Sequence, residues 1–252
     1  MAKIIILGSS YAIPDETHEN SHFVVVGREK TVLVDCVSNP ILRLRQANLD
    51  FNLLTDLILT HFHPDHVSGV PLLLMDMWLM GRRNPLDIYG LHHTLDRIED
   101  LMGFYDWDRW PDFFPVVFHR LPSQPTAVLA CDEFRIMAAP VQHLIPTIGL
   151  RFEFTEIDRV FVYSCDTEPC QAVIDLASGA DILLHEASGA SKGHSSAAQA
   201  GAIARQAEAN ALYLTHYPTG AFYRPEVLLS EAATEFQGKI GLAEDFLELD
   251  LS

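Results

Sequence analysis

The amino-acid sequence predicts an α/β protein in which layers of β-sheet are covered by helices. Short runs with the composition of β-strands recur along the chain, each bounded by Gly, Pro, Asn or Asp. Segments with helical spacing and capping residues stand between several of these runs. The chain has 252 residues, 48% of them hydrophobic, which is enough to bury a sizeable core between such layers.

The strands are predicted from runs of β-branched, aliphatic and aromatic residues. In chain order they are Lys3–Leu7, His22–Gly27, Thr31–Asp35, Leu57–Thr60, Leu86–Tyr89, Phe134–Ala138, Ile148–Phe154, Arg159–Ser164, Ile182–His185 and Ala211–Thr215.

The helices are predicted from starting and capping residues and from apolar spacing. They are Ile41–Ala47, Val67–Met80, Leu95–Met102 and Ala197–Ala209. Pro40 precedes the first of them, and Ser195 or Ser196 is the expected cap of the alanine-rich last one. The second and third frame an aromatic-rich segment, 104–118. The resulting order is mainly strands with a few helices, in two halves that meet near residue 120.

The charge balance disfavours two classes of partner. Seventeen Lys and Arg stand against 34 Asp and Glu, a formal charge of −17 with neutral histidines. Nucleic-acid binding depends on basic side chains that neutralise phosphates, and an anionic membrane surface attracts the same side chains. Long nucleic acid and membranes are therefore not expected partners.

Cysteine usage and hydropathy predict a soluble, cytoplasmic protein. The four cysteines are scattered without a CxxC pair, which fits reduced thiols better than a disulfide framework. The apolar start Lys3–Leu7 breaks at Gly8 and is too short for a signal peptide. The apolar stretch Val67–Met80 contains Asp76 and falls short of the roughly 20 residues that span a bilayer.

The segment LILTHFHPDHVSG carries the strongest chemical signal in the chain. His61, His63, Asp65 and His66 follow directly after an apolar strand. Burying four such polar groups at one strand end is costly unless they bind something. Imidazole suits zinc and related metals, whereas carboxylate suits harder ions, so this cluster can divide between two cations.

Four later positions repeat the pattern of a polar residue that ends an apolar strand. They are His143, Asp166, His185 and His216. Strands of a mainly parallel sheet present such residues at one edge, where ligands bind. Taken with the first cluster, the pattern favours His143, Asp166 and His216 as further metal ligands. The two oxygens of Asp166 are able to bridge two cations.

The sequence resembles the metallo-β-lactamase superfamily over essentially the whole chain. THFHPDH matches the HxHxDH motif of that superfamily. Within it, the chain looks most like the ribonuclease Z group and its phosphodiesterase relatives. The segments that carry this resemblance are LGSSYAIPDETHENS, GVPLLLMDMWLMGRRNPLDIYG, YSCDT, LLHEAS, GHSSAAQAGAIARQA and LTHYP.

The resemblance implies a four-layer αββα fold and two metal ions in each chain. A single domain over 1–252 would consist of two βαβ-type halves, with a helical and aromatic insertion at about 70–118. The expected metal is zinc, with Mn, Fe or Ni as alternatives. The implied ligands are His61, His63 and His143 for one ion, and Asp65, His66 and His216 for the other, with Asp166 bridging them. His185 and Glu186 would lie behind the ligands without binding metal.

The resemblance also implies a reaction and an assembly. A hydroxide shared by the two ions would attack a phosphodiester, with Asp65 orienting it. His194 matches a histidine that lies near the scissile phosphate in these phosphodiesterases, and it would serve the leaving oxygen. Asp65 and His194 are therefore the expected catalytic residues, and the protein is expected to be a homodimer.

One departure from the ribonuclease Z pattern shapes the expected substrate. Those enzymes carry a long basic arm for tRNA between the positions that match His143 and Asp166, which here are only 23 residues apart. The sequence therefore favours a phosphodiesterase for small or nucleotide-like substrates. A hydrolase of carboxylic esters, thioesters or lactones is the alternative, and a tRNA 3′ endonuclease ranks third. A metal-binding redox or sensor protein is disfavoured, because His63 stands where such relatives have glutamate.

Overall fold

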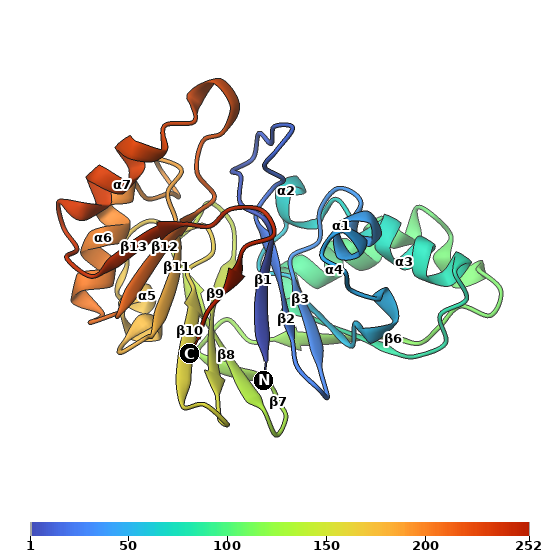
Figure 1. Ribbon diagram of the computed structural model, residues 1–252. Helices are drawn as coiled ribbons and strands as arrows, with labels where there is room; N and C mark the ends of the chain where they lie inside the picture. Colours follow the sequence, from blue (N-terminus) through green and yellow to red (C-terminus); the bar gives the residue numbers. More distant parts are fainter. Residues whose placement is uncertain (1, 252) are drawn as a thin grey trace.

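Two seven-stranded sheets face one another, and helices cover the outer face of each (Figure 1). The computed structural model describes residues 2–251. Each sheet buries one face against the other sheet and its second face against helices, so the chain forms four layers in the order α, β, β, α. The four-layer αββα fold predicted from the sequence is confirmed.

The first sheet contains the amino-terminal strands and one strand from the end of the chain. Its spatial order is β14 (Glu248–Leu249), β1 (Lys3–Gly8), β2 (His22–Val26), β3 (Thr31–Val34), β4 (Asp56–Ile58), β5 (Leu86–Leu91) and β6 (Val116–Leu121). Strands β3 to β6 are parallel. The helices of this half are α1 (Pro40–Gln46), α2 (Pro64–Val67), α3 (Val70–Leu79) and α4 (His92–Gly103).

The second sheet is built from the other half of the chain. Its order is β13 (Lys239–Leu242), β12 (Ala211–Thr215), β11 (Ile182–Glu186), β10 (Arg159–Tyr163), β9 (Thr147–Phe154), β8 (Phe134–Val141) and β7 (Thr126–Ala130). Strands β10 to β13 are parallel, while β7 to β10 alternate in direction. The helices of this half are α5 (Gln171–Ala177), α6 (Ala197–Gln206) and α7 (Pro225–Ala233).

The sequence predicts an insertion at about 70–118, but in the structure this segment is part of the first sheet and of the helices that cover it. It supplies β5 and part of β6 to the first sheet, so it belongs to the layers themselves. The predicted helix Val67–Met80 is also divided into α2 and α3 at Gly69. The Gly69 amide donates to the carbonyl of Cys36 at 2.9 Å, and a Cβ at Gly69 would lie 2.7 Å from the backbone of Val37. Close packing against this backbone therefore requires glycine at the break.

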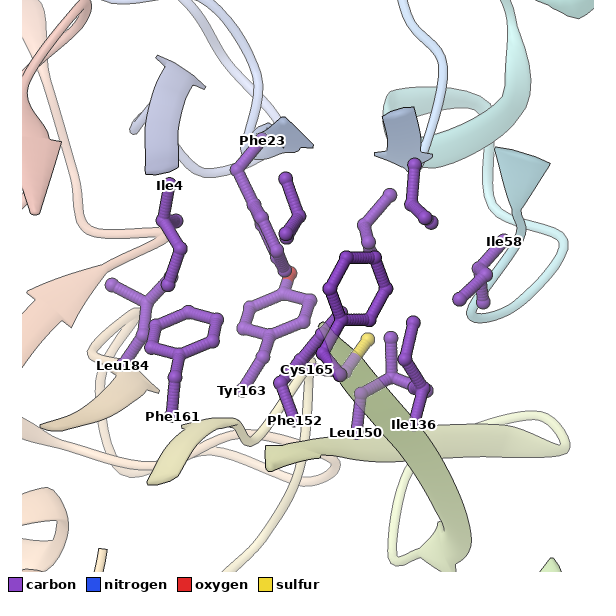
Figure 2. Close-up of a cluster of buried hydrophobic side chains, with 14 of the residues drawn as sticks. Ile4, Phe23, Ile58, Ile136, Leu150, Phe152, Phe161, Tyr163, Cys165 and Leu184 are labelled. Carbon is purple, nitrogen blue, oxygen red and sulfur yellow. The ribbon is translucent and has the colours of Figure 1, made fainter. Parts of the chain in front are cut away.

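The core between the sheets is rich in aromatic rings (Figure 2). Phe23 from the first sheet meets the edges of Phe161 and Tyr163 from the second, with ring centroids 5.4 and 5.2 Å apart. Alternation along β10 turns Phe161 and Tyr163 toward this core and Val162 toward the helices. These contacts hold the sheets face to face, so that the carboxyl ends of β4 and β10 meet at one edge.

Candidate active site

The predicted ligand residues lie together at the edge where parallel strands of both sheets end. His61 and His63 follow β4, and Asp65 and His66 lie on the short helix α2. The second sheet contributes residues that follow β8, β10 and β12, namely His143, Asp166 and His216. Residues far apart in the chain are thus brought together as the strand-end pattern predicts.

Three imidazoles converge in the first group. Nε2 of His61 lies 3.0 Å from Nδ1 of His63, which lies 3.1 Å from Nε2 of His143. Two ligand nitrogens on one tetrahedral zinc ion are about 3.3 Å apart, from bonds of about 2.0 Å. The spacing of these three nitrogens therefore fits one cation.

The second group combines two histidines with two carboxylates. Nε2 of His216 lies 3.4 Å from one oxygen of Asp65 and 3.4 Å from one oxygen of Asp166. Nε2 of His66 lies 3.5 Å from the other oxygen of Asp166. Asp166 also reaches the first group, since its oxygen lies 3.9 Å from Nε2 of His143. Asp166 thus lies between the two groups.

Two buried atoms of the second group have no hydrogen-bond partner among the described residues. They are Nε2 of His66 and one carboxylate oxygen, Oδ1, of Asp166. The two atoms lie 3.5 Å apart, and leaving them buried without a hydrogen bond is costly, so they favour a bound cation between them. Burial raises the pKa of Asp65, but its hydrogen bond with His216 and the charge of His66 outweigh burial and lower that pKa to about 2. These residues fit a divalent cation with nitrogen and oxygen ligands.

Each histidine that presents Nε2 to these groups has its Nδ1 hydrogen-bonded behind it. The Nδ1 contacts are His61 to Thr60 Oγ1 at 3.1 Å, His66 to Asp35 at 2.7 Å, His143 to the Gly193 carbonyl at 2.7 Å and His216 to Ser188 Oγ at 2.7 Å. A hydrogen bond at Nδ1 fixes the tautomer and leaves Nε2 free to coordinate. This arrangement is the usual support of metal-binding histidines.

Asp35 is a functional residue that the sequence analysis did not single out. Its buried carboxylate accepts from His66 and from the amide and hydroxyl of Thr60, both at 2.9 Å. Although burial disfavours the charged form, the carboxylates of Asp166 and Asp35 raise the pKa of His66. Asp35 follows the apolar run Thr31–Val34, so it shows the same strand-end signal that marked the predicted ligands.

His194 lies beside both groups and is held by Glu186. Nδ1 of His194 donates to the buried Glu186 carboxylate at 2.9 Å, and this hydrogen bond raises the pKa of His194. Glu186 also accepts from the Thr167 amide at 2.8 Å. The His194 ring lies parallel to that of His216, 5.8 Å away, and lines a groove of about 420 Å³ with Lys192 and Gln199. Glu186 therefore holds the His194 ring at an opening beside the cluster.

His185 is not brought to the cluster. Strand alternation turns Glu186 toward the site and His185 toward the opposite face of β11. Nδ1 of His185 donates to the Glu186 carbonyl at 2.8 Å, and its Nε2 has no partner within residues 2–251. Of the two residues expected behind the ligands, only Glu186 contacts the site.

The fold and this cluster agree with a comparison with known families. Residues 30–217 match the family model described as "Beta-lactamase superfamily domain". The match covers most of the chain, which therefore belongs to this superfamily and is a metal-dependent hydrolase of the metallo-β-lactamase fold.

Within the superfamily, the chain is a homologue of proteins named ribonuclease Z. The protein of that name from Methanothermobacter thermautotrophicus is 27% identical over 307 aligned positions, which cover all of this chain and 97% of the relative. That from Azobacteroides pseudotrichonymphae is 30% identical, with 96% of each chain covered. The 307 positions exceed the 252 residues of this chain, so the first relative contains segments that this chain lacks.

Solved structures show the same fold. The metallo-β-lactamase fold protein YhfI from Bacillus subtilis superposes with a TM-score of 0.83 at 24% identity, over 99% of this chain and all of that one. Human tRNase Z, short form, superposes over the full length of both chains with a TM-score of 0.75 at 23% identity. A diphosphatase from the PhnP family gives a TM-score of 0.76 at 19% identity, over all of this chain and 98% of that one.

Among the described residues, none of the helices has the length and apolar character that a membrane span requires.

Proposed function

We propose that this protein hydrolyses phosphodiesters with two divalent cations, one held by each group of the candidate site. The observation that carries this proposal is the convergence of seven predicted ligand side chains beside the Glu186–His194 pair. Three histidines serve the first cation, and Asp65, His66 and His216 serve the second, with Asp166 shared. Zinc is the expected metal, since imidazole dominates the donor set.

The residues of the chain divide the chemistry between them. Bound cations would supply an activated water and offset the charge of the phosphate. Asp65 is ionised and partly exposed, so its carboxylate is able to accept a hydrogen bond from the attacking water. The leaving oxygen needs a proton or a positive charge, which a histidine provides. The hydrogen bond with Glu186 raises the pKa of His194, which favours the protonated form that this role requires.

Two observations bear on the substrate within this reaction class. The relatives that cover the whole chain are named ribonuclease Z, which favours RNA cleavage more strongly than the ranking from the sequence did. In this chain, however, β9 and β10 are joined by the short turn 155–158, and the net charge is −17. The short turn leaves no room for a basic RNA-binding arm, and the negative net charge disfavours binding of a long RNA. We therefore propose small or nucleotide-like phosphodiesters as substrates, with tRNA 3′ processing as the second candidate.

The test is hydrolysis of bis(p-nitrophenyl) phosphate by protein with its metal content measured, alongside cleavage of a precursor tRNA. Turnover of the small ester with about two metal ions per chain, lost on chelation and restored by Zn or Mn, is expected. Efficient precursor cleavage would instead make ribonuclease Z activity the function. Metal-loaded protein that cleaves neither substrate would contradict phosphodiester hydrolysis and direct assays to carboxylic esters, thioesters and lactones.

We also propose that the protein is a cytoplasmic homodimer. Helix α3 exposes Leu72 and Leu79, and Met80 caps its carboxyl end; 40%, 64% and 37% of their respective surfaces are accessible. Apolar side chains gathered on one helix favour a self-complementary contact. Light scattering of the wild-type protein should give about twice the mass of one chain, and Leu79→Glu should give the mass of one chain. A wild-type protein with the mass of one chain would contradict the dimer.

A further inference from the structure

Cys165 occupies a constrained position directly before Asp166. It follows the carboxyl end of β10, and its side chain is completely buried. Its φ of 55° lies in the left-handed region, which residues with a Cβ adopt only at a cost in free energy. The surrounding structure therefore holds a thiol here in a conformation that would suit glycine.

The thiol lies against the back of a predicted ligand ring. Its sulfur is 3.6 Å from Nδ1 of His61, on the side of the ring away from His63 and His143. The same Nδ1 lies 3.1 Å from the Thr60 hydroxyl, which donates its own hydrogen to Asp35. Since Nε2 of His61 faces His63, the sulfur lies at the opposite nitrogen of the ring.

A second polar group is buried beside the thiol. The hydroxyl of Tyr163 is enclosed in the core and has no hydrogen-bond partner among residues 2–251. Burial and the neighbouring Cys165 side chain raise the pKa of Tyr163, and Figure 2 shows the two side chains as neighbours. A thiol sulfur is a weak hydrogen-bond acceptor, suited to a hydroxyl and an imidazole N–H that have few other partners.

We propose that Cys165 is a positioning residue for His61. The Thr60 hydroxyl and the Cys165 thiol both contact Nδ1 of the ring and accept its hydrogen, so that Nδ1 stays protonated and Nε2 points at the first cation. The inference depends on the ligand set proposed above, but not on the identity of the substrate. Partners behind a ligand typically change metal affinity by about 10–100-fold when removed.

The experiment compares wild-type protein with Cys165→Gly and Cys165→Ser. Glycine suits a φ of 55°, so Cys165→Gly removes the thiol without straining the backbone. Zn²⁺ affinity is measured by competition with a chelator, and the d–d spectrum is recorded with Co²⁺. We expect the affinity of the first site to fall about 10-fold in Cys165→Gly and less in Cys165→Ser. The Co²⁺ spectrum should change while the melting temperature of the metal-free protein is retained.

Cys131→Ser is the matched control, because the Cys131 thiol contacts the Phe134 carbonyl in the β7–β8 turn. It should leave Zn²⁺ affinity unchanged.

Equal affinity in wild type and Cys165→Gly would overturn the positioning role. So would a thiolate-to-cobalt charge-transfer band that disappears in Cys165→Gly, because Cys165 would then be a ligand itself. A wild-type protein that binds no metal would overturn the ligand set as well, whereas inactivity toward phosphodiesters with normal metal binding would leave the role of Cys165 intact.

Discussion

The carboxylate of Asp35 accepts a hydrogen bond of 2.7 Å from Nδ1 of His66, and both side chains are completely buried. Asp35 follows β3 and His66 lies on α2, so the contact joins the end of one parallel strand to the helix after the next. The same carboxylate accepts two hydrogen bonds from Thr60, whose hydroxyl lies against His61. One buried carboxylate therefore orients a histidine in each group of the candidate site.

Asp35→Asn should weaken metal binding strongly. The amide N–H groups would face the donors of His66 and Thr60, which now donate to a carboxylate. Buried donors would then lack an acceptor. We expect metal affinity to fall about 10–100-fold and the free energy of unfolding to fall by about 2–4 kcal/mol. Chelator competition and urea unfolding measure the two effects. Asp87→Asn is the control, because Asp87 pairs with His119 at 2.6 Å outside the site; equal losses in both variants would contradict the prediction.

Glu186→Gln should reduce turnover while both metal ions are retained. Without the carboxylate, His194 loses the partner that orients it and favours its protonated form. We expect kcat to fall by roughly 10²-fold, the usual scale for losing a general acid. Because Glu186 acts through His194, adding Glu186→Gln to His194→Ala should cost little more. Steady-state kinetics with metal analysis tests this, and fully additive losses in kcat would show that Glu186 acts independently.

Metal should stabilise the fold as well as enable activity. Both groups form only when the two sheets are assembled, so cations that bind them favour the folded state. At a free concentration of about 100 times Kd, one such site contributes about 2.7 kcal/mol. Thermal unfolding with graded Zn²⁺ should show a rising Tm, reversed by chelator. In His63→Ala we expect one metal ion per chain in place of two; unchanged metal content would remove His63 from the ligand set.

Acid should destabilise the metal-free protein partly through His22. Burial lowers the pKa of His22 to about 3, below the 6.5 of an exposed histidine. Between these values the unfolded chain binds a proton that the folded chain does not, so stability falls as pH falls from about 6.5 toward 3. The slope from one such group is at most about 1.4 kcal/mol per pH unit.

His22→Asn isolates this effect. Its amide nitrogen is able to replace Nδ1 of His22, which donates to the Asn20 carbonyl at 2.7 Å, but it cannot titrate. Urea unfolding between pH 7 and 4 should give a shallower decline in this variant than in wild type. His92→Asn, at an exposed position on α4, should keep the wild-type slope. An unchanged slope in His22→Asn would assign the acid sensitivity to other groups.

Much of the layer structure follows from local signals in the sequence. Each predicted strand and helix overlaps an observed one, because buried strands and capped helices carry dense apolar and capping patterns. The strands that escaped prediction, β6, β7, β13 and β14, are mostly only partly buried, so their patterns are weak. The break at Gly69 also escaped, since it depends on backbone from a distant turn rather than on helical spacing.

By itself, the sequence determined the class of protein and the residues that gather at its site. Polar side chains that directly follow apolar strands are costly to bury without a metal. They can therefore be recognised in the sequence as candidate ligands. Only the tertiary structure decided what stands behind them. Asp35 lies 2.7 Å from His66 and Cys165 lies 3.6 Å from His61, in each case between segments remote in sequence. Of the two residues predicted behind the ligands, His185 is excluded by the direction of one strand. The contact between Cys165 and His61 depends on how the two sheets pack, which no local pattern records.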